Sequence, residues 1–147
     1  MEERLFSSRE VSVISGVTGR QLQWWDENEI ISPLRRDGRR AYDTQQLLEV
    51  LVIAAFRRKQ LSLQKIRRVM RLLRRKKGRE SGKDRRGSMY VLTDGHAVHL
   101  EDQPDRILSL LSESARSMYV VCLDDQIRRI EAYNEVQRRA KRQLALF

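Results

Sequence analysis

The start of the chain places apolar residues at helical spacing behind a capping signal. Ser7 and Glu10 have the spacing of a capping box, in which each side chain bonds the other residue's backbone N–H. Val11 and Ile14 then lie three residues apart, on one helical face. Gly16 is typical of the residue that follows a helix end. The pattern predicts a short helix that ends at Gly16.

A second short helix is predicted directly after this stop. Thr18 and Gln21 repeat the capping spacing, and Leu22 and Trp25 give the new helix a buried face. Two short helices joined by a tight turn are typical of a helix-turn-helix unit. The first turn of the second helix in such a unit can enter the major groove of DNA.

A hairpin with basic arms follows the second helix. Pro33 prevents the helix from continuing, and Asp37-Gly38 is a strong signal for a two-residue hairpin turn. The arms carry Arg35, Arg36, Arg39 and Arg40. Beside a helix-turn-helix, such a hairpin is a wing whose arginines can reach phosphates or a minor groove. The alternative is a solvated surface hairpin, in which four neighbouring cations would repel one another without an anion.

Two longer helices are predicted next. Asp43 caps a third helix that is apolar over most of its length, and Ser62 caps a fourth with one apolar face. The other face of the fourth helix carries a basic stripe made of Lys65, Arg67, Arg68, Arg71, Arg74 and Arg75. The sequence leaves three roles open for this stripe: a solvated face, a contact with the DNA backbone, or a stiff connection to a partner subunit.

The chain divides into three predicted segments. Residues 1–75 form a winged helix-turn-helix head, and residues 76–87 form a charged, glycine-containing linker. Residues 88–147 have the pattern of a small ββαβα module for dimerisation or sensing. The predicted fold class is therefore mainly α with small β. The last helix begins at Asp124-Asp125, and its apolar seam could either contact a second subunit or pack on the module's own sheet.

Charge supports a nucleic-acid partner. The net charge is +10, and a basic protein gains affinity for DNA by releasing counterions from phosphates. The basic charge is concentrated in the head and the tail, because residues 88–126 carry seven acids (Asp94, Glu101, Asp102, Asp105, Glu113, Asp124 and Asp125) against Arg106 and Arg116. A well-solvated protein that happens to be basic is the alternative.

Candidate chemistry other than DNA binding is sparse. The single cysteine, Cys122, excludes an internal disulfide or a cysteine-based zinc site, and His96 and His99 lack a convincing set of further ligands. We expect no cofactor, no metal site and no catalytic residue. No apolar run is long enough to span a bilayer, and the first residues are unlike a signal peptide, so we expect a cytoplasmic protein.

The head resembles the MerR family of bacterial transcription regulators over roughly residues 5–73. Arg20-Gln21-Leu22-Gln23-Trp24-Trp25-Asp26 is similar to the family's second-helix motif, usually written R-T-L-R-Y-Y-E. Gly38-Arg39-Arg40-Ala41-Tyr42-Asp43 is similar to its wing and the start of the following helix. Further matching stretches are Ser8-Arg9-Glu10-Val11, Gly16-Val17-Thr18, Glu29-Ile30-Ile31-Ser32-Pro33 and Leu61-Ser62-Leu63-Gln64-Lys65-Ile66.

The resemblance implies a homodimer on a pseudo-palindromic promoter site in double-stranded DNA, in the bacterial nucleoid. It also implies help to RNA polymerase at a badly spaced promoter, or repression. The candidate DNA-contacting residues are Thr18, Arg20, Gln21, Gln23, Trp24, Arg35, Arg36, Arg39, Arg40 and Tyr42. Gln23 stands where arginine is usual, which puts the contact expected of that arginine in doubt. Trp24 and Trp25 stand where paired tyrosines are usual; Trp24 could meet a phosphate, and Trp25 is expected in the core.

The second half departs from the family, and several functions stay open. Many members continue into one long dimerisation helix, whereas this chain has the predicted linker and module. Neither the dimer geometry nor a small-molecule effector can be carried over. The alternatives are an architectural or excisionase-like DNA-binding protein and a protein-binding scaffold. An enzyme is disfavoured because no catalytic constellation is present in the sequence.

Overall fold

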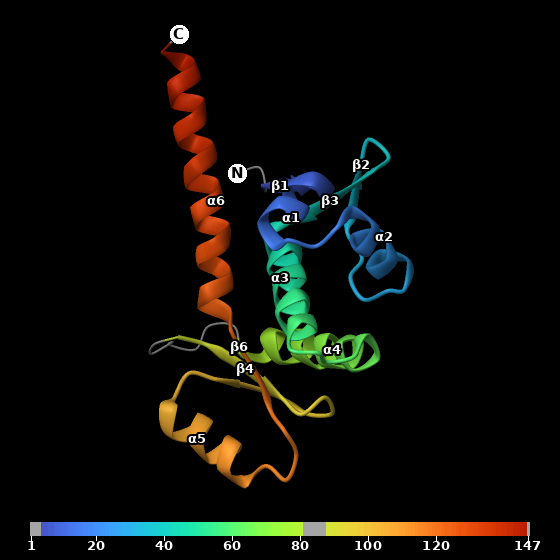
Figure 1. The fold of residues 1–147 in the computed structure, drawn as a ribbon, viewed down its shortest axis with the longest axis vertical. Helices are drawn as coiled ribbons and strands as arrows, with labels where there is room; N and C mark the ends of the chain where they lie inside the picture. The colour runs from blue at the N-terminus through green and yellow to red at the C-terminus, as the bar shows by residue number, and fades with distance from the viewer. Residues whose placement is uncertain (1–3, 81–87, 147) are drawn as a thin grey trace.

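The chain folds into a mainly helical protein with two small sheets, seen in a computed structural model (Figure 1). The structure describes residues 4–80 and 88–146, apart from the side chains of 77–80. The first half contains β1 (Leu5–Ser7), α1 (Ser8–Ser15), α2 (Gly19–Glu27), β2 (Leu34–Arg36), β3 (Arg39–Asp43), α3 (Thr44–Arg58) and α4 (Leu63–Glu80). The second half contains β4 (Tyr90–Thr93), β5 (Val98–Glu101), α5 (Pro104–Glu113), β6 (Tyr119–Cys122) and α6 (Leu123–Ala145).

The capping signals read from the sequence set the ends of the first helices. Ser7 and Glu10 bond each other's backbone at the start of α1, and α1 ends at Gly16 in the left-handed conformation. Thr18 and Gln21 form the same reciprocal bonds at the start of α2. The two helices and their turn are thus the predicted helix-turn-helix, and each capping box satisfies two backbone N–H groups at its helix start.

The first sheet has the strand order β1-β3-β2, with both pairs antiparallel. The β2–β3 hairpin is the predicted wing, and its turn residues Asp37 and Gly38 both have positive φ, at 52° and 75°. This conformation matches a turn of the kind that Asp-Gly favours. Strand β1 was not predicted: its three residues carry little pattern of their own, and pairing with β3 defines it.

Helix α3 lies at the centre of the molecule. Its residues from Leu47 to Phe56 are all buried, and the helix packs against α1, α4, α6 and strands of both sheets. The largest fully buried side chains of the core include Phe6, Tyr42, Leu51 and Phe56. A helix buried around its whole circumference organises the elements that cover it.

The second sheet has the strand order β5-β4-β6 and packs beside α3 and α4. Val91, Val98 and Val121 belong to the same hydrophobic cluster as the residues of the head, so the two halves share one core. The elements after residue 88 follow in the order β4, β5, α5, β6, α6. That they form a separate module stays a prediction.

Helix α4 is longer than the sequence indicated. It continues to Glu80, so residues 76–80 of the predicted linker are helical. Residues 81–87 of the predicted linker lie outside the described residues. Across the described part of the chain, no helix combines the length and apolarity needed to cross a membrane.

The neighbouring tryptophans of α2 provide a test of the core. Trp25 is 3% exposed and packs under the helix-turn-helix, whereas Trp24 is 45% exposed. We predict that Trp25→Ala lowers the free energy of unfolding by about 3–5 kcal/mol, through lost apolar burial and the cavity it leaves. Trp24→Ala is the matched control, with a change below roughly 1 kcal/mol. Urea unfolding followed by circular dichroism measures both. A stable Trp25→Ala protein with altered DNA sequence preference would contradict this role.

Candidate nucleic-acid interface

Helix α2 presents a row of polar side chains on its exposed face. Arg20, Gln21, Gln23 and Trp24 are all exposed, while Leu22 and Trp25 fill the core on the opposite side. Arg20 makes no hydrogen bond to any described residue, so its guanidinium can donate to an external acceptor. One face of α2 thus packs in the core, and the other is exposed to solvent.

Local hydrogen bonds fix several of these side chains. The Gln21 carboxamide oxygen accepts from the Thr18 backbone N–H at 3.0 Å, while the Gln21 backbone N–H donates to the Thr18 hydroxyl at 3.1 Å. The Gln23 amide donates to Glu27 at 2.9 Å, and Asn28 donates to the backbone carbonyl of Trp24 at 2.8 Å. Thr18 and Gln21 therefore shape the helix start, and the Gln21 amide nitrogen keeps its donor capacity.

The wing carries its four arginines in two cross-strand pairs. Arg36 lies opposite Arg39 next to the turn, and Arg35 lies opposite Arg40 one step further from it. Like charges directly opposite each other on a hairpin are destabilising unless another group neutralises them. Arg36 and Arg39 are exposed, and neither bonds a described side chain. Together with Asp37 in the turn, the two arginines leave the wing tip with a net positive charge, which favours an anionic partner.

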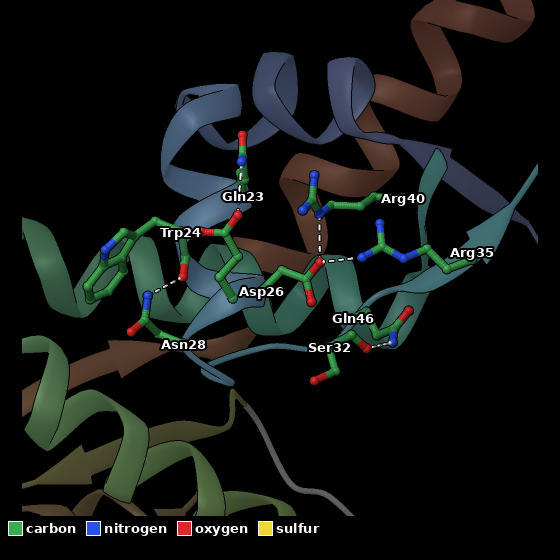
Figure 2. Close-up of polar contacts among 9 residues, drawn as sticks. Gln23, Trp24, Asp26, Asn28, Ser32, Arg35, Arg40 and Gln46 are labelled. Carbon is green, nitrogen blue, oxygen red and sulfur yellow. Dashed lines mark hydrogen bonds and ion pairs between the residues drawn. The ribbon is translucent and has the colours of Figure 1, made fainter. Parts of the chain in front are cut away.

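The inner pair of wing arginines shares one carboxylate of α2, which offsets one of their two charges. One oxygen of Asp26 accepts from Arg40 Nε at 2.7 Å and from Arg35 at 2.9 Å, and Figure 2 shows both guanidinium groups turned toward this carboxylate. Asp26 and Arg40 are both largely buried at their side chains. The contact ties the hairpin to the helix, so that α2 and the wing form one surface.

Residues 6–73 match the family model described as MerR HTH family regulatory protein. This part of the chain is a MerR-family helix-turn-helix domain. The family is one of regulators, which indicates DNA-binding transcription regulation as the function class. The match covers the helix-turn-helix, the wing and α3, and it ends within α4. No curated protein matches the chain.

Tyr42 is the candidate that the structure removes from the surface of the MerR domain. Its side chain is fully buried, and its hydroxyl has no hydrogen-bond partner among the described residues. Burial raises the pKa of Tyr42 to about 12, with a smaller opposing effect from Arg40. A fully buried side chain offers no surface to DNA, so the expectation that Tyr42 contacts DNA is corrected: the residue supports the base of the wing.

The MerR domain holds further residues near this surface that the sequence did not single out. Asp26 belongs to the second-helix motif, but its partners Arg35 and Arg40 lie nine and fourteen residues further along the chain, where no local pattern indicates them. Arg57 and Arg58, at the end of α3, line a hollow of about 240 Å³ beside the α1–α2 turn. They add two cations near the start of α2, and only the fold brings them there.

Two arginines of the basic stripe have a structural role in the MerR domain. Arg74 of α4 donates to Glu49 of α3 at 2.6 Å and to the Ile30 carbonyl at 3.0 Å, and Arg67 donates to the Asn28 carbonyl. They therefore hold the segment that leaves α2. Gln46 holds the same segment further along by donating to the Ser32 carbonyl at 2.8 Å, as Figure 2 shows.

We predict that Tyr42→Phe leaves DNA affinity unchanged and keeps or raises the free energy of unfolding at neutral pH, by up to about 1 kcal/mol. The reason is that the change removes an unpaired buried hydroxyl. The pH dependence has a definite sign. Because the folded pKa of Tyr42, about 12, exceeds the ordinary 10.0, the folded state keeps a proton that the unfolded state loses. Wild-type stability then falls as pH rises above 10.

Tyr42→Phe lacks this loss of stability in alkali. The free energies of unfolding of the two proteins, measured by urea unfolding at a series of pH values, should therefore diverge above pH 10.0. Any other stability loss in alkali is common to both proteins and cancels in the difference. A marked loss of DNA affinity in Tyr42→Phe would show that the hydroxyl contributes to DNA binding.

Asp26→Asn tests the link between the helix and the wing. We predict a loss of about 1–2 kcal/mol in the free energy of unfolding, because two partly buried charge-assisted hydrogen bonds weaken. We also predict tighter binding to random DNA, since one negative charge is removed, and a smaller preference for the specific site, since the wing is less fixed. Glu27→Gln is the matched control: it neutralises the adjacent exposed acid, which bonds only Gln23. If both variants show the same ratio of specific to random DNA affinity in competition titrations, the Asp26 contacts with Arg35 and Arg40 (the Asp26 clamp) do not position the wing.

Proposed function

We propose that this protein is a sequence-specific regulator of transcription that binds a pseudo-palindromic promoter site as a homodimer. The observation that carries the proposal is the joint surface of α2 and the wing, which the Asp26 contacts hold together within a MerR-family domain. A helix for the groove and a cationic hairpin beside it are the two parts that such recognition needs.

The proposed contacts divide into two kinds. Arg20, Gln21, Gln23 and Trp24 lie on the exposed side of α2, where side chains can reach base edges or flanking phosphates. Arg36 and Arg39 at the wing tip have no acidic partner among the described residues and are assigned to phosphates or a minor groove. Arg35 and Arg40 are already paired with Asp26, so we assign them first to positioning the wing.

Dimerisation is assigned to α6, the longest helix. Its first half packs on the head, where Arg129 donates to the Ile14 carbonyl at 2.8 Å and Tyr133 donates to Glu10 at 2.9 Å. Its second half leaves Val136, 60% exposed, and Leu144, 76% exposed, on the outside. With Ala140 between them, these residues follow one another at four-residue spacing, and such an apolar series on an exposed helix favours pairing with a second helix.

The proposed setting follows from this function. A regulator of this kind acts in the cytoplasm, on the nucleoid, and a contact with RNA polymerase at the bound promoter is a further expectation from the family. We propose no cofactor. An architectural DNA-binding protein would share the α2 and wing surface, and binding to promoter DNA no tighter than to random DNA would favour it.

The proposal is tested by a mobility-shift titration on promoter DNA upstream of the protein's own gene, at about 50 and 200 mM salt with random duplex as competitor. We expect a specific complex of two chains per site whose affinity falls steeply with salt. Arg39→Ala should weaken specific and random complexes alike and reduce the salt slope by about 1, as for one lost phosphate contact. Arg116→Ala removes the same charge from the loop before β6 and should change neither. An unaltered slope in Arg39→Ala would take the wing tip out of the interface.

A further inference from the structure

Helices α3 and α6 border a hollow at the junction of the head and the last helix. The two helices lie side by side (Figure 1), and the start of α3 and the first half of α6 leave a space of about 510 Å³. Its lining residues are Thr44, Gln45, Leu48, Ile127, Ile130, Glu131 and Asn134. Binding sites for small molecules are concave and have volumes of this order, so the hollow can hold a small ligand.

The floor of the hollow is apolar. Leu48 and Ile130 are buried and belong to the main core, and Ile127 is half-buried and packs against it. These side chains are held by the core whether or not a ligand is bound. The floor is therefore preformed, and an apolar group placed on it removes further apolar surface from water.

The rim of the hollow is polar, and its hydrogen-bonding groups are unused within the chain. Thr44 and Gln45 belong to α3, whereas Glu131 and Asn134 belong to α6. None of these four side chains forms a hydrogen bond or an ion pair with another described residue. Polar groups from two helices thus converge on one apolar floor, which is the arrangement that orients a small ligand.

The charge of the rim indicates which ligand it suits. Among the described residues that line the hollow, Glu131 is the only charged one. Its neighbours on α6 are occupied elsewhere: Arg128 pairs with Asp125 at 3.0 Å, and Glu135 pairs with the two arginines that follow it. The positive end of the α3 dipole lies at Thr44, so a cationic group is favoured on the α6 side, next to Glu131.

We propose that the hollow between α3 and α6 binds a small primary amine with an apolar body. An ammonium group has three N–H donors and no acceptor, which suits the Glu131 carboxylate together with the carboxamide oxygen of Asn134. The apolar body then covers the floor, and Thr44 and Gln45 border it on the other side. The inference does not depend on the proposed function, because the hollow is a feature of the single chain.

A ligand in the hollow would contact α6 on a flank of its own. On another flank, Arg129 and Tyr133 bond α6 to the Ile14 carbonyl and to Glu10 of α1. Residues 127, 130, 131 and 134 face a different direction on a helix of 3.6 residues per turn. The bound amine would therefore add a second attachment of α6 to the head, and binding to the folded chain alone should raise its unfolding temperature.

The test is a two-dimensional NMR titration of the isotope-labelled full chain with three ligands that share one apolar body: 4-phenylbutylamine, 4-phenylbutanol and 4-phenylbutanoate. We expect the amine to shift the backbone amides at the start of α3 and at residues 127–134, with a dissociation constant of about 1 mM. The alcohol should bind more weakly, and the carboxylate most weakly. Because the chain has a net charge of +10, non-specific attraction would give the opposite order.

Matched variants test the two parts of the site. Glu131→Gln should raise the dissociation constant of the amine roughly three- to tenfold and leave that of the alcohol unchanged. Glu135→Gln removes the same charge one turn along α6, outside the lining, and should change neither. Thr44→Trp fills the hollow from an exposed position and should weaken both ligands.

Equal binding of the three ligands, or shifts confined to other residues, would overturn the inference. It would also be wrong if no ligand shifts these amides while Thr44→Trp changes the dimer dissociation constant in sedimentation velocity, because a second copy of the chain then covers the hollow. A chain that binds the amine here but shows no preference for promoter DNA would support this inference and refute only the proposed function.

Discussion

The burial of α3 on all sides is the constraint on which the rest of the structure depends. A helix buried around its whole circumference, as α3 is from Leu47 to Phe56, has no solvent face there, so other elements must cover each side of it. Helices α1, α4 and α6 and strands β1, β3 and β6 each pack against it. The helix-turn-helix, the wing strands and the second sheet are therefore arranged around α3.

One charged residue on α3, Glu49, helps to fix the position of the segment that follows α2. Glu49 is almost fully buried and is paired with Arg74, which also donates to the Ile30 carbonyl. An unpaired buried carboxylate is costly, so α4 is held in the position that brings Arg74 to it. The same guanidinium then fixes the chain between α2 and the wing. The packing of α4 on α3 and the hydrogen bonds of Arg74 therefore stabilise the same arrangement of α3, α4 and the segment after α2.

The features predictable from sequence were those determined by neighbours in the chain. The capping boxes at Ser7 and Thr18 and the Asp37-Gly38 turn depend on residues within three or four positions, and each is present as predicted. Strand β1 and the Asp26 clamp depend on partners brought together only by folding. Tyr42 shows the same limit, because a matching motif does not reveal whether a side chain is buried.

The attachment of α6 to the head has a consequence for DNA recognition by a dimer. Tyr133 of α6 bonds the Glu10 side chain, and Arg129 bonds the Ile14 carbonyl of α1. Glu10 also accepts from the Ser7 backbone N–H in the capping box of α1. The helix to which dimerisation is assigned in the proposal is thus joined to the helix-turn-helix by direct hydrogen bonds. In the proposed dimer, α6 would then set the distance between the two α2 helices, and with it the spacing of the half-sites. A shift of α6 against α1 would move the heads relative to each other without altering any residue that contacts DNA.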